Sequence, residues 1–327
     1  MVSLGLAVWV RYGLGYPIPL EHLRLTDRSR KILKYAVLLG PIVVAAAAIQ
    51  RHWILRRSAS QSGLPMYGWL DTFQALRNDG VFYRILLAVT TLLLMISLFS
   101  LFALWKASIV LIHPWHLDAT LIGIDRALHG GVLPQELSQR WFGPRATVFL
   151  DRLYYLWFRV LALFIVWQSF RAASRSRTRT LLAVTLTYSL LGNLLALLLS
   201  SGGPVYYSRL VGWPDPYAEH AAYLAAIPRL EATHVQEAIW RWLINGKYLP
   251  FGTISAMPSM HVAAVTVIAL ACWEKNRWLG AAAWIYVLLI LVGSVHLNWH
   301  YAIDGYAAIL GTIAVWALSG WLVRRYR

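Results

Sequence analysis

Charged residues are scarce in this chain. Only 13% of its 327 residues are Asp, Glu, Lys or Arg, and the acidic ones are fewer, 14 against 30 Lys and Arg. Soluble domains contain nearly twice that share of charge, so an ordinary soluble protein is excluded. The net charge of +16 would also suit nucleic acid, but no soluble basic domain is present to bind it. We therefore expect basic loops that anchor membrane segments beside anionic lipid headgroups.

Cysteine is nearly absent as well. Cys272, inside an apolar stretch, is the single one, so a disulfide within the chain is excluded and the sequence gives no sign of the redox compartment. The first apolar stretch, MVSLGLAVWV, has no basic residues ahead of it. That pattern argues against a cleaved signal peptide.

Long apolar runs dominate the rest of the chain. Ile85–Trp105 and Leu181–Ser201 each extend over 21 residues without a charge, and about 20 apolar residues in a helix cross a bilayer core. Further spans are predicted at Val148–Phe170, Ser259–Trp273, Leu279–Val295 and Tyr301–Val323, with a kinked span at Tyr35–Ile49 and a span or interfacial helix at Leu4–Leu20. Because helices satisfy their own backbone groups in lipid, the prediction is an all-α, polytopic transmembrane helix bundle.

The loops predict the orientation of this bundle. Four arginines in Arg171–Thr180, the Lys275/Arg277 turn and the tail Arg324–Arg327 fall on one face, which the positive-inside rule makes cytoplasmic. The long loop 202–258 and the turn at 296–300 then share the opposite face. Apolar residues at helical spacing within 113–137 predict an amphipathic interfacial helix. We divide the chain into an N-terminal membrane or interfacial region, 1–80, and a transmembrane domain, 81–327.

One turn between two spans holds three ionisable groups. In GSVHLNWHYAIDGY, His296, His300 and Asp304 follow one another at intervals of four residues, which places them on one face if the segment is helical. Ionisable groups at a membrane are costly and are functional candidates by default. A carboxylate one turn from an imidazole can accept its N–H and fix its tautomer. The alternatives are a structural hydrogen-bonded pair between helices or a zinc site.

A second polar element opens an apolar span. Pro258-Ser259-Met260-His261 begins the segment, and Ser259 can cap a helix whose free N–H groups and positive dipole end attract an anion. The threading puts His261 on the same face as His300. One histidine oriented by Asp304 and another at an anion-binding helix start suit phosphoryl transfer through a phosphohistidine.

These two motifs carry a family resemblance. PSMH, followed one helical hairpin later by HYAID, resembles the type 2 phosphatidic acid phosphatase (PAP2) superfamily and, more narrowly, its inositol phosphorylceramide synthase and sphingomyelin synthase branch. GGPVYY, Gly202–Tyr207, and the D-x-x-L-x-x-x-D-R-x-L-x-G run, Asp118–Gly130, resemble motifs of bacterial members. The resemblance covers about 118–323. It implies a six-helix PAP2-like core with one or two extra N-terminal membrane segments.

The resemblance also implies roles for the residues. His300 attacks phosphorus, Asp304 orients it and His261 protonates the departing alkoxide, with no metal and no cofactor. The chain departs from the phosphatase members, because we find no K-x6-RP motif and because Gly293 and Ser294 stand where those members have Ser-Arg. A phosphodiester has one negative charge and needs fewer cations than a monoester.

The departures favour a phosphotransferase that takes a headgroup from a phospholipid donor to a lipid hydroxyl acceptor. A PAP2-type phosphatase is the alternative, and a transporter with a His/Asp proton relay is a further one. The candidate substrate-binding residues are Ser259, Tyr206, Tyr207, Arg209, Ser294, His296 and Arg159. Against such roles, 202–207 can be a turn in an aromatic belt, Arg159 can snorkel, and His296 can be an interfacial imidazole. We expect a bacterial inner membrane rather than a eukaryotic organelle membrane, with the active site on the extracytoplasmic face.

Overall fold

The computed structural model describes residues 69, 71, 74, 81–245 and 254–326. The predicted membrane segments at Leu4–Leu20 and Tyr35–Ile49 lie outside the described residues. Helices follow one another through the described part of the chain: α4 (Val81–Ile112), α5 (Asp118–Leu128), α6 (Pro134–Trp141), α7 (Pro144–Phe170), α8 (Arg175–Leu186), η2 (Thr187–Leu195), α9 (Ala196–Leu198), η3 (Pro204–Tyr206), α10 (Tyr207–Leu210), α11 (Ala218–Ala225), α12 (Glu231–Ile244), α13 (Met260–Lys275), α14 (Arg277–His296) and α15 (Ala302–Arg325). No strand occurs in these residues, which confirms the all-α prediction.

Within the described residues, four helical segments are long and apolar enough to cross a membrane. They are Tyr83–Val110, Arg175–Leu198, Arg277–His296 and Ala302–Arg325. The second runs continuously through α8, η2 and α9, and η2 is π-helical, a rare conformation that the sequence pattern does not reveal. These segments confirm a multi-pass helical membrane bundle.

Helix α13 forms the centre of this bundle. Its residues from Val262 to Ala269 are buried almost without exception, and the small side chains of Ala263, Ala264 and Ala269 allow neighbouring helices to approach closely. Helices α7, α8, α14 and α15 pack around it. Because α13 contacts protein on nearly all sides, its first residues, which include His261, lie inside the molecule rather than on its lipid-facing surface.

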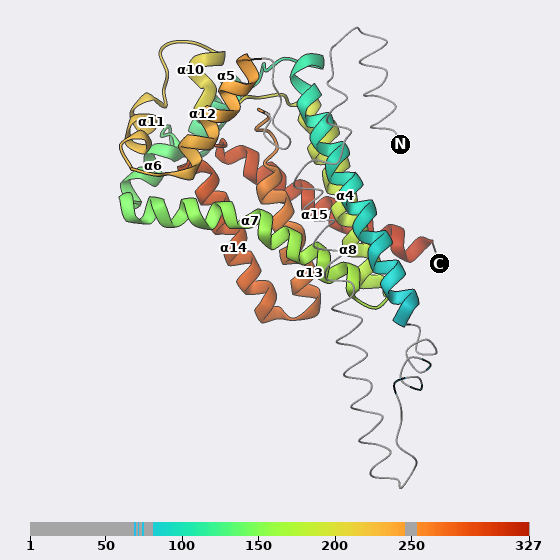
Figure 1. The fold of residues 1–327 in the computed structure, drawn as a ribbon. Helices are drawn as coiled ribbons and strands as arrows, with labels where there is room; N and C mark the ends of the chain where they lie inside the picture. The colour runs from blue at the N-terminus through green and yellow to red at the C-terminus, as the bar shows by residue number, and fades with distance from the viewer. Residues whose placement is uncertain (1–68, 70, 72–73, 75–80, 246–253, 327) are drawn as a thin grey trace.

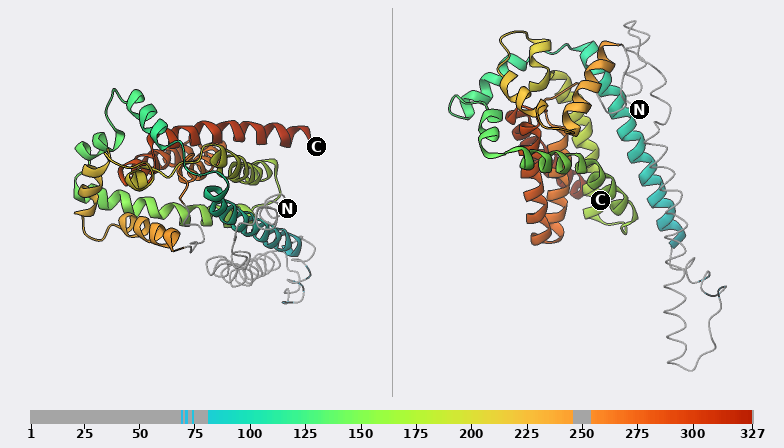
Figure 2. Two further views of the ribbon diagram at one scale, coloured as in Figure 1. Left: turned by 90° about the horizontal axis from the view of Figure 1, so that it is seen from above. Right: turned by 60° about the vertical axis from the view of Figure 1, so that its left-hand side comes forward.

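The two ends of the bundle differ. The short helices α5, α6, α10, α11 and α12 gather at one end, and the tight turn of the α13–α14 hairpin lies at the other (Figures 1 and 2). The segment at 113–137, predicted as one interfacial helix, forms two helices at the first of these ends, α5 and α6. They are separated by Gly130 and Gly131, whose φ angles are positive, 67° and 87°. The first residues of α13 and α15 and the last residues of α14 point to the end with the short helices.

Candidate active site

The start of α13 places one histidine of the site. Ser259 is the N-cap residue, and its hydroxyl accepts the N–H of Val262 at 3.5 Å. Its own N–H donates to the backbone carbonyl of Asp304 at 3.1 Å, which joins the start of α13 to the first turn of α15. His261 follows in the first turn of α13. Ser259 is fully buried, so its cap is part of the interior of the site.

The turn between α14 and α15 places the other two residues. Helix α14 ends at His296, Asn298 takes a left-handed conformation with φ of 62°, and α15 begins at Ala302. The N–H of His300 donates to the carbonyl of Ser294 at 3.2 Å. The helix is therefore interrupted between His296 and His300, so the three ionisable groups do not continue along one helix face.

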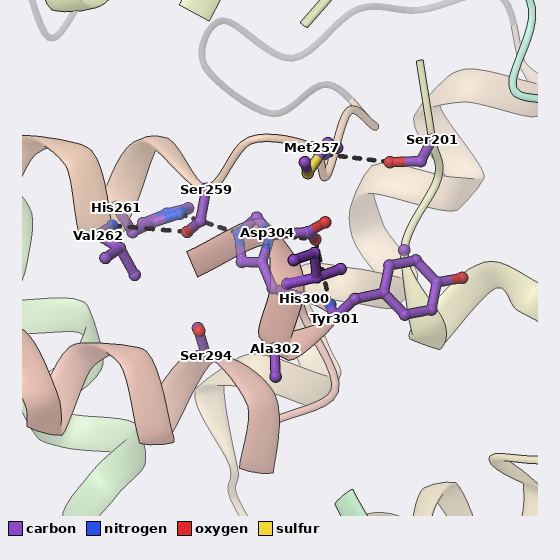
Figure 3. Close-up of polar contacts among 12 residues, drawn as sticks. Ser201, Met257, Ser259, His261, Val262, Ser294, His300, Tyr301, Ala302 and Asp304 are labelled. Carbon is purple, nitrogen blue, oxygen red and sulfur yellow. Dashed lines mark hydrogen bonds and ion pairs between the residues drawn. The ribbon is translucent and has the colours of Figure 1, made fainter. Parts of the chain in front are cut away.

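The imidazoles of His261 in α13 and His300 in the turn lie in a row with the carboxylate of Asp304 in α15 (Figure 3). His300 Nδ1 lies 3.1 Å from Asp304 Oδ2, and His300 Nε2 lies 3.4 Å from His261 Nδ1. The ring centroids of the two histidines are 5.6 Å apart. A carboxylate only accepts hydrogen bonds when ionised, so Asp304 selects the tautomer with the proton on Nδ1. The Nε2 lone pair of His300 then points to His261.

The site is lined by aromatic rings and is shielded from water. His261 packs against the rings of Tyr154 and Trp157, with centroid distances of 4.9 Å and 4.6 Å. His300 is only 4% exposed and Asp304 is fully buried. Burial lowers the pKa of His300, which lies in the turn between two spans, so its imidazole is neutral at pH 7. A neutral imidazole with a free lone pair is a competent nucleophile.

Lys106 of α4 is a charged residue of this site that the sequence analysis missed. Its ammonium group lies near the Phe102 ring, 5.9 Å from the centroid, and its charge acts on both His261 and His300. Amine side chains are rarely enclosed in a bundle unless they serve a purpose. Lys106 therefore adds a positive charge beside the two imidazoles.

A sequence signal for Lys106 exists. Lys106 is followed, after six residues, by His113 and Pro114, so the stretch has the spacing of the K-x6-RP motif with histidine in the arginine position. A strict search for arginine misses it, and the apolar run chosen as a span ended at Trp105, one residue earlier. His113 is exposed and packs against the ring of His116, so of these two residues only Lys106 has an electrostatic effect on the site histidines.

Several predicted substrate-binding residues have other partners. The hydroxyl of Tyr206 donates to the Gln236 carbonyl at 2.8 Å, and Arg209 pairs with Glu237 at 2.8 Å. Tyr207 packs against the Tyr217 ring, and Arg159 is exposed on α7. The hydroxyl of Ser294 donates to the Leu291 carbonyl. Among the described residues, none of these side chains forms a hydrogen bond or ring contact with the His261–His300–Asp304 row.

His296 belongs to a separate cluster. Its Nδ1 lies 2.9 Å from the Ser138 hydroxyl and its Nε2 lies 2.8 Å from the Thr147 hydroxyl. His220 of α11 donates from Nε2 to the His296 carbonyl at 2.7 Å. These bonds tie α6, α7 and α11 to the end of α14, so His296 is a connecting residue next to the site.

Comparison with known proteins gives one match. The model of the PAP2 superfamily matches residues 119–318, a range that includes α5, both histidine segments and all of α13 and α14. No curated protein and no solved structure matches the chain. The matched range covers more than half of the chain and contains the row of two imidazoles and a carboxylate, and the chain belongs to the PAP2 superfamily.

Proposed function

We propose that the protein is a lipid phosphotransferase of the membrane, in which His300 carries the transferred phospho-headgroup. The family membership suggests a phosphatase or phosphotransferase. One observation supports His300 as the nucleophile: its Nδ1 faces Asp304 at 3.1 Å while its Nε2 faces His261 at 3.4 Å. The same contacts give His261 the position of the general acid.

The reaction has two steps. The Nε2 lone pair of His300 forms a bond to phosphorus, the bond from phosphorus to the lipid alkoxide breaks, and His261, which enters this step as the imidazolium, gives one proton to that alkoxide and becomes neutral. In the second step His261 removes the proton of an acceptor hydroxyl, whose oxygen attacks phosphorus and breaks the P–N bond. Because the two rings are in contact, they have to separate or tilt to admit the phosphoryl group. Asp304 holds the Nδ1 proton throughout.

The charge around the site favours a phosphodiester donor. Lys106 acts on both imidazoles, whereas Gly293 and Ser294 offer no cation at the position where phosphatase members have arginine. A diester has a single negative charge, and one ammonium group with the start of α13 can neutralise it. The proposed donor is therefore a phospholipid and the proposed acceptor is a lipid hydroxyl, as in inositol phosphorylceramide synthase.

A product assay tests this proposal. Purified protein is incubated with headgroup-labelled phospholipids, with and without diacylglycerol, ceramide or polyprenol. We expect a new labelled lipid that forms only with an acceptor, and a phosphohistidine on His300 by mass spectrometry after acid-free digestion. Free phosphate or free phospho-headgroup without an acceptor would indicate a phosphatase that uses water instead. Turnover in His300→Gln equal to the wild-type rate would refute the mechanism.

The site faces the extracytoplasmic side in this proposal, because the basic segments at 171–180 and 275–277 lie at the other end of the helices. Ala173 and His234 are exposed at the two ends. In a Cys272→Ser background, a membrane-impermeant thiol reagent added to intact cells should label His234→Cys and spare Ala173→Cys. The reverse pattern would invert the orientation.

A further inference from the structure

A carboxylate of helix α5, that of Asp125, binds the first turn of α15. Asp125 Oδ2 accepts the N–H of Ala302 at 2.7 Å, and its Oδ1 accepts the N–H of Ile303 at 2.9 Å. The first N–H groups of a helix have no partners within the helix and need an acceptor. The N-cap position of α15 is occupied by Tyr301, a residue type that is not a good cap. Asp125 therefore caps α15 from another helix.

A second carboxylate of α5 holds the neighbouring segments. Asp118 precedes Asp125 by seven residues, so the two lie on one face of the helix. Asp118 Oδ1 accepts the hydroxyl of Tyr301 and the N–H of Gly203, both at 2.8 Å, and its Oδ2 accepts the N–H of Gly202 at 2.9 Å. Both carboxyl groups are buried, with exposures of 2% and 0%. Buried carboxylates persist only with such partners.

The segment 201–205, which contains the two glycines that Asp118 binds, also contacts the segments that carry both histidines. Gly203 has φ of 94°, and a Cβ there would lie 2.8 Å from the Trp299 carbonyl oxygen, so a side chain is excluded. The N–H of Val205 donates to the Asn298 carbonyl at 3.1 Å, within the turn that leads to His300. Ser201 accepts from Ala256 and Met257 in the segment ahead of His261. The segments ahead of His261 and His300 are therefore both hydrogen-bonded to the loop that Asp118 binds.

From these contacts we infer that Asp125, with Asp118, is a positioning residue for phosphoryl transfer: it fixes the first turn of α15 so that Asp304 meets His300. This inference rests on the proposed function, since the position of His300 affects a rate only if His300 reacts. Asp304 Oδ2 accepts the N–H of Tyr301 at 3.1 Å, one residue before the N–H groups that Asp125 holds. A shift of this turn moves the carboxylate away from the imidazole, and a displacement of about 1 Å can reduce a rate about 100-fold.

The chain offers a matched control for this test. Asp151 of α7 accepts the N–H groups of Glu231 and Ala232 at 2.9 Å and 3.0 Å, at the start of α12. It is 3% exposed, so its burial and its capping role match those of Asp125. Asp125→Asn and Asp151→Asn each replace one accepting oxygen by an NH2 group that opposes a backbone N–H. The two variants should lose similar thermal stability, but only Asp125→Asn should disturb α15.

Two readouts separate the inference from the proposed function. The first is kcat and KM for the labelled phospholipid that the wild-type protein turns over. We expect kcat to fall about 10- to 100-fold in Asp125→Asn at nearly unchanged KM, and to stay within about threefold in Asp151→Asn. The second is the ring 15N spectrum of His300 in 15N-histidine-labelled protein, assigned with His300→Gln. It should show one Nδ1–H tautomer in the wild type and in Asp151→Asn, and mixed tautomers in Asp125→Asn.

The outcomes decide the inference in each case. Equal rate losses in the two variants, together with an unchanged His300 spectrum, would overturn it. If the wild-type protein turns over none of the phospholipids, the proposed function fails, and the spectrum alone decides the inference. If Asp125→Asn does not fold, Tyr301→Phe removes only the hydroxyl bond to Asp118. A severalfold lower kcat with mixed His300 tautomers in Tyr301→Phe would then support the positioning role of the two α5 carboxylates. Wild-type behaviour in both readouts would overturn it.

Discussion

His296 and His300 are four residues apart, and their imidazoles are connected to the protein in opposite ways. Both nitrogens of His296 are held by hydroxyl groups, those of Ser138 and Thr147. His300 has a carboxylate on one nitrogen and another imidazole on the other. Hydroxyl partners can satisfy either tautomer, whereas a carboxylate accepts only from N–H. Burial is common to both imidazoles, so the feature that distinguishes His300 is the carboxylate on its Nδ1 and the second imidazole on its Nε2.

The largest difference between the two histidines should appear in their glutamine variants. His300→Gln removes the proposed nucleophile, and we expect the transfer rate to fall at least about 10⁴-fold. His296→Gln should keep the rate within about threefold and instead lower stability by about 1–3 kcal/mol, because it removes the hydrogen bonds of the buried imidazole to Ser138 and Thr147. Labelled-lipid turnover and thermal unfolding in detergent measure the two effects. A similar rate loss in both variants would erase the distinction.

The carboxylate is the next element of the comparison, since His300 has one and His296 has none among its hydrogen-bond partners within the described residues. Asp304→Asn keeps the shape of the side chain but lets the imidazole take the wrong tautomer. We expect a rate about 10³- to 10⁴-fold lower in a variant that still folds. Single-turnover kinetics should place the loss in formation of the phosphohistidine. A wild-type rate in Asp304→Asn would show that His300 needs no orienting group.

A nearby charge is a third difference between the two histidines. The positive charge of Lys106 acts on His300 and also on His261. Lys106→Met should lower kcat about 10²- to 10³-fold, the usual cost of removing one group that stabilises developing negative charge. Lys106→Arg should recover part of that rate, because it restores the cation. The buried Arg177, which binds the carbonyls of Gln168 and Ser169, is the control. Arg177→Met should affect stability rather than kcat, and equal kcat losses would contradict the role of Lys106.

Local sequence patterns predicted the four candidate spans among the described residues and the contact of His300 with Asp304, because apolar run length and four-residue spacing are local properties. The segments predicted as spans at Val148–Phe170 and Ser259–Trp273 form α7 and α13, which are not among these four. The helical arrangement is confirmed, with α15 spanning the segment predicted at Tyr301–Val323. The roles of His261, His300 and Asp304 stay predictions. Lys106 carried a signal in its spacing to His113 and Pro114, but its effect on the imidazoles depends on how α4 packs against α7 and η2, which no local pattern predicts.

The same limit applies to the contacts of His296. Its partners Ser138 and Thr147 lie about 150 residues earlier in the chain, and no spacing rule connects them. Asp118 and Asp125 carried a signal in the D-x6-D spacing, which indicates one helix face but not what that face holds. Their partners in α15 depend on how α5 docks on the bundle. Long-range hydrogen bonds of this kind are set by tertiary packing, which a single sequence does not encode in any local pattern.

The smallest expected effect concerns His220, the partner of His296. His220 lies in α11, outside the spans, and burial lowers its pKa below the ordinary value of 6.5. Its hydrogen-bond partners, the Gln139 amide and the His296 carbonyl, carry no net charge, and the bond to the carbonyl offsets only part of the effect of burial on the pKa. The unfolded chain therefore binds this proton more readily than the folded protein, so stability is highest above pH 6.5 and falls as the pH drops below it. Wild-type protein should melt at a lower temperature at pH 5 than at pH 7.5, and His220→Gln should be less stable at pH 7.5 with a smaller pH dependence. Thermal unfolding in detergent at both pH values checks this. If the melting temperature of His220→Gln changes with pH as much as that of the wild type, another group must titrate. The two histidine clusters would then differ only in their hydrogen-bond partners.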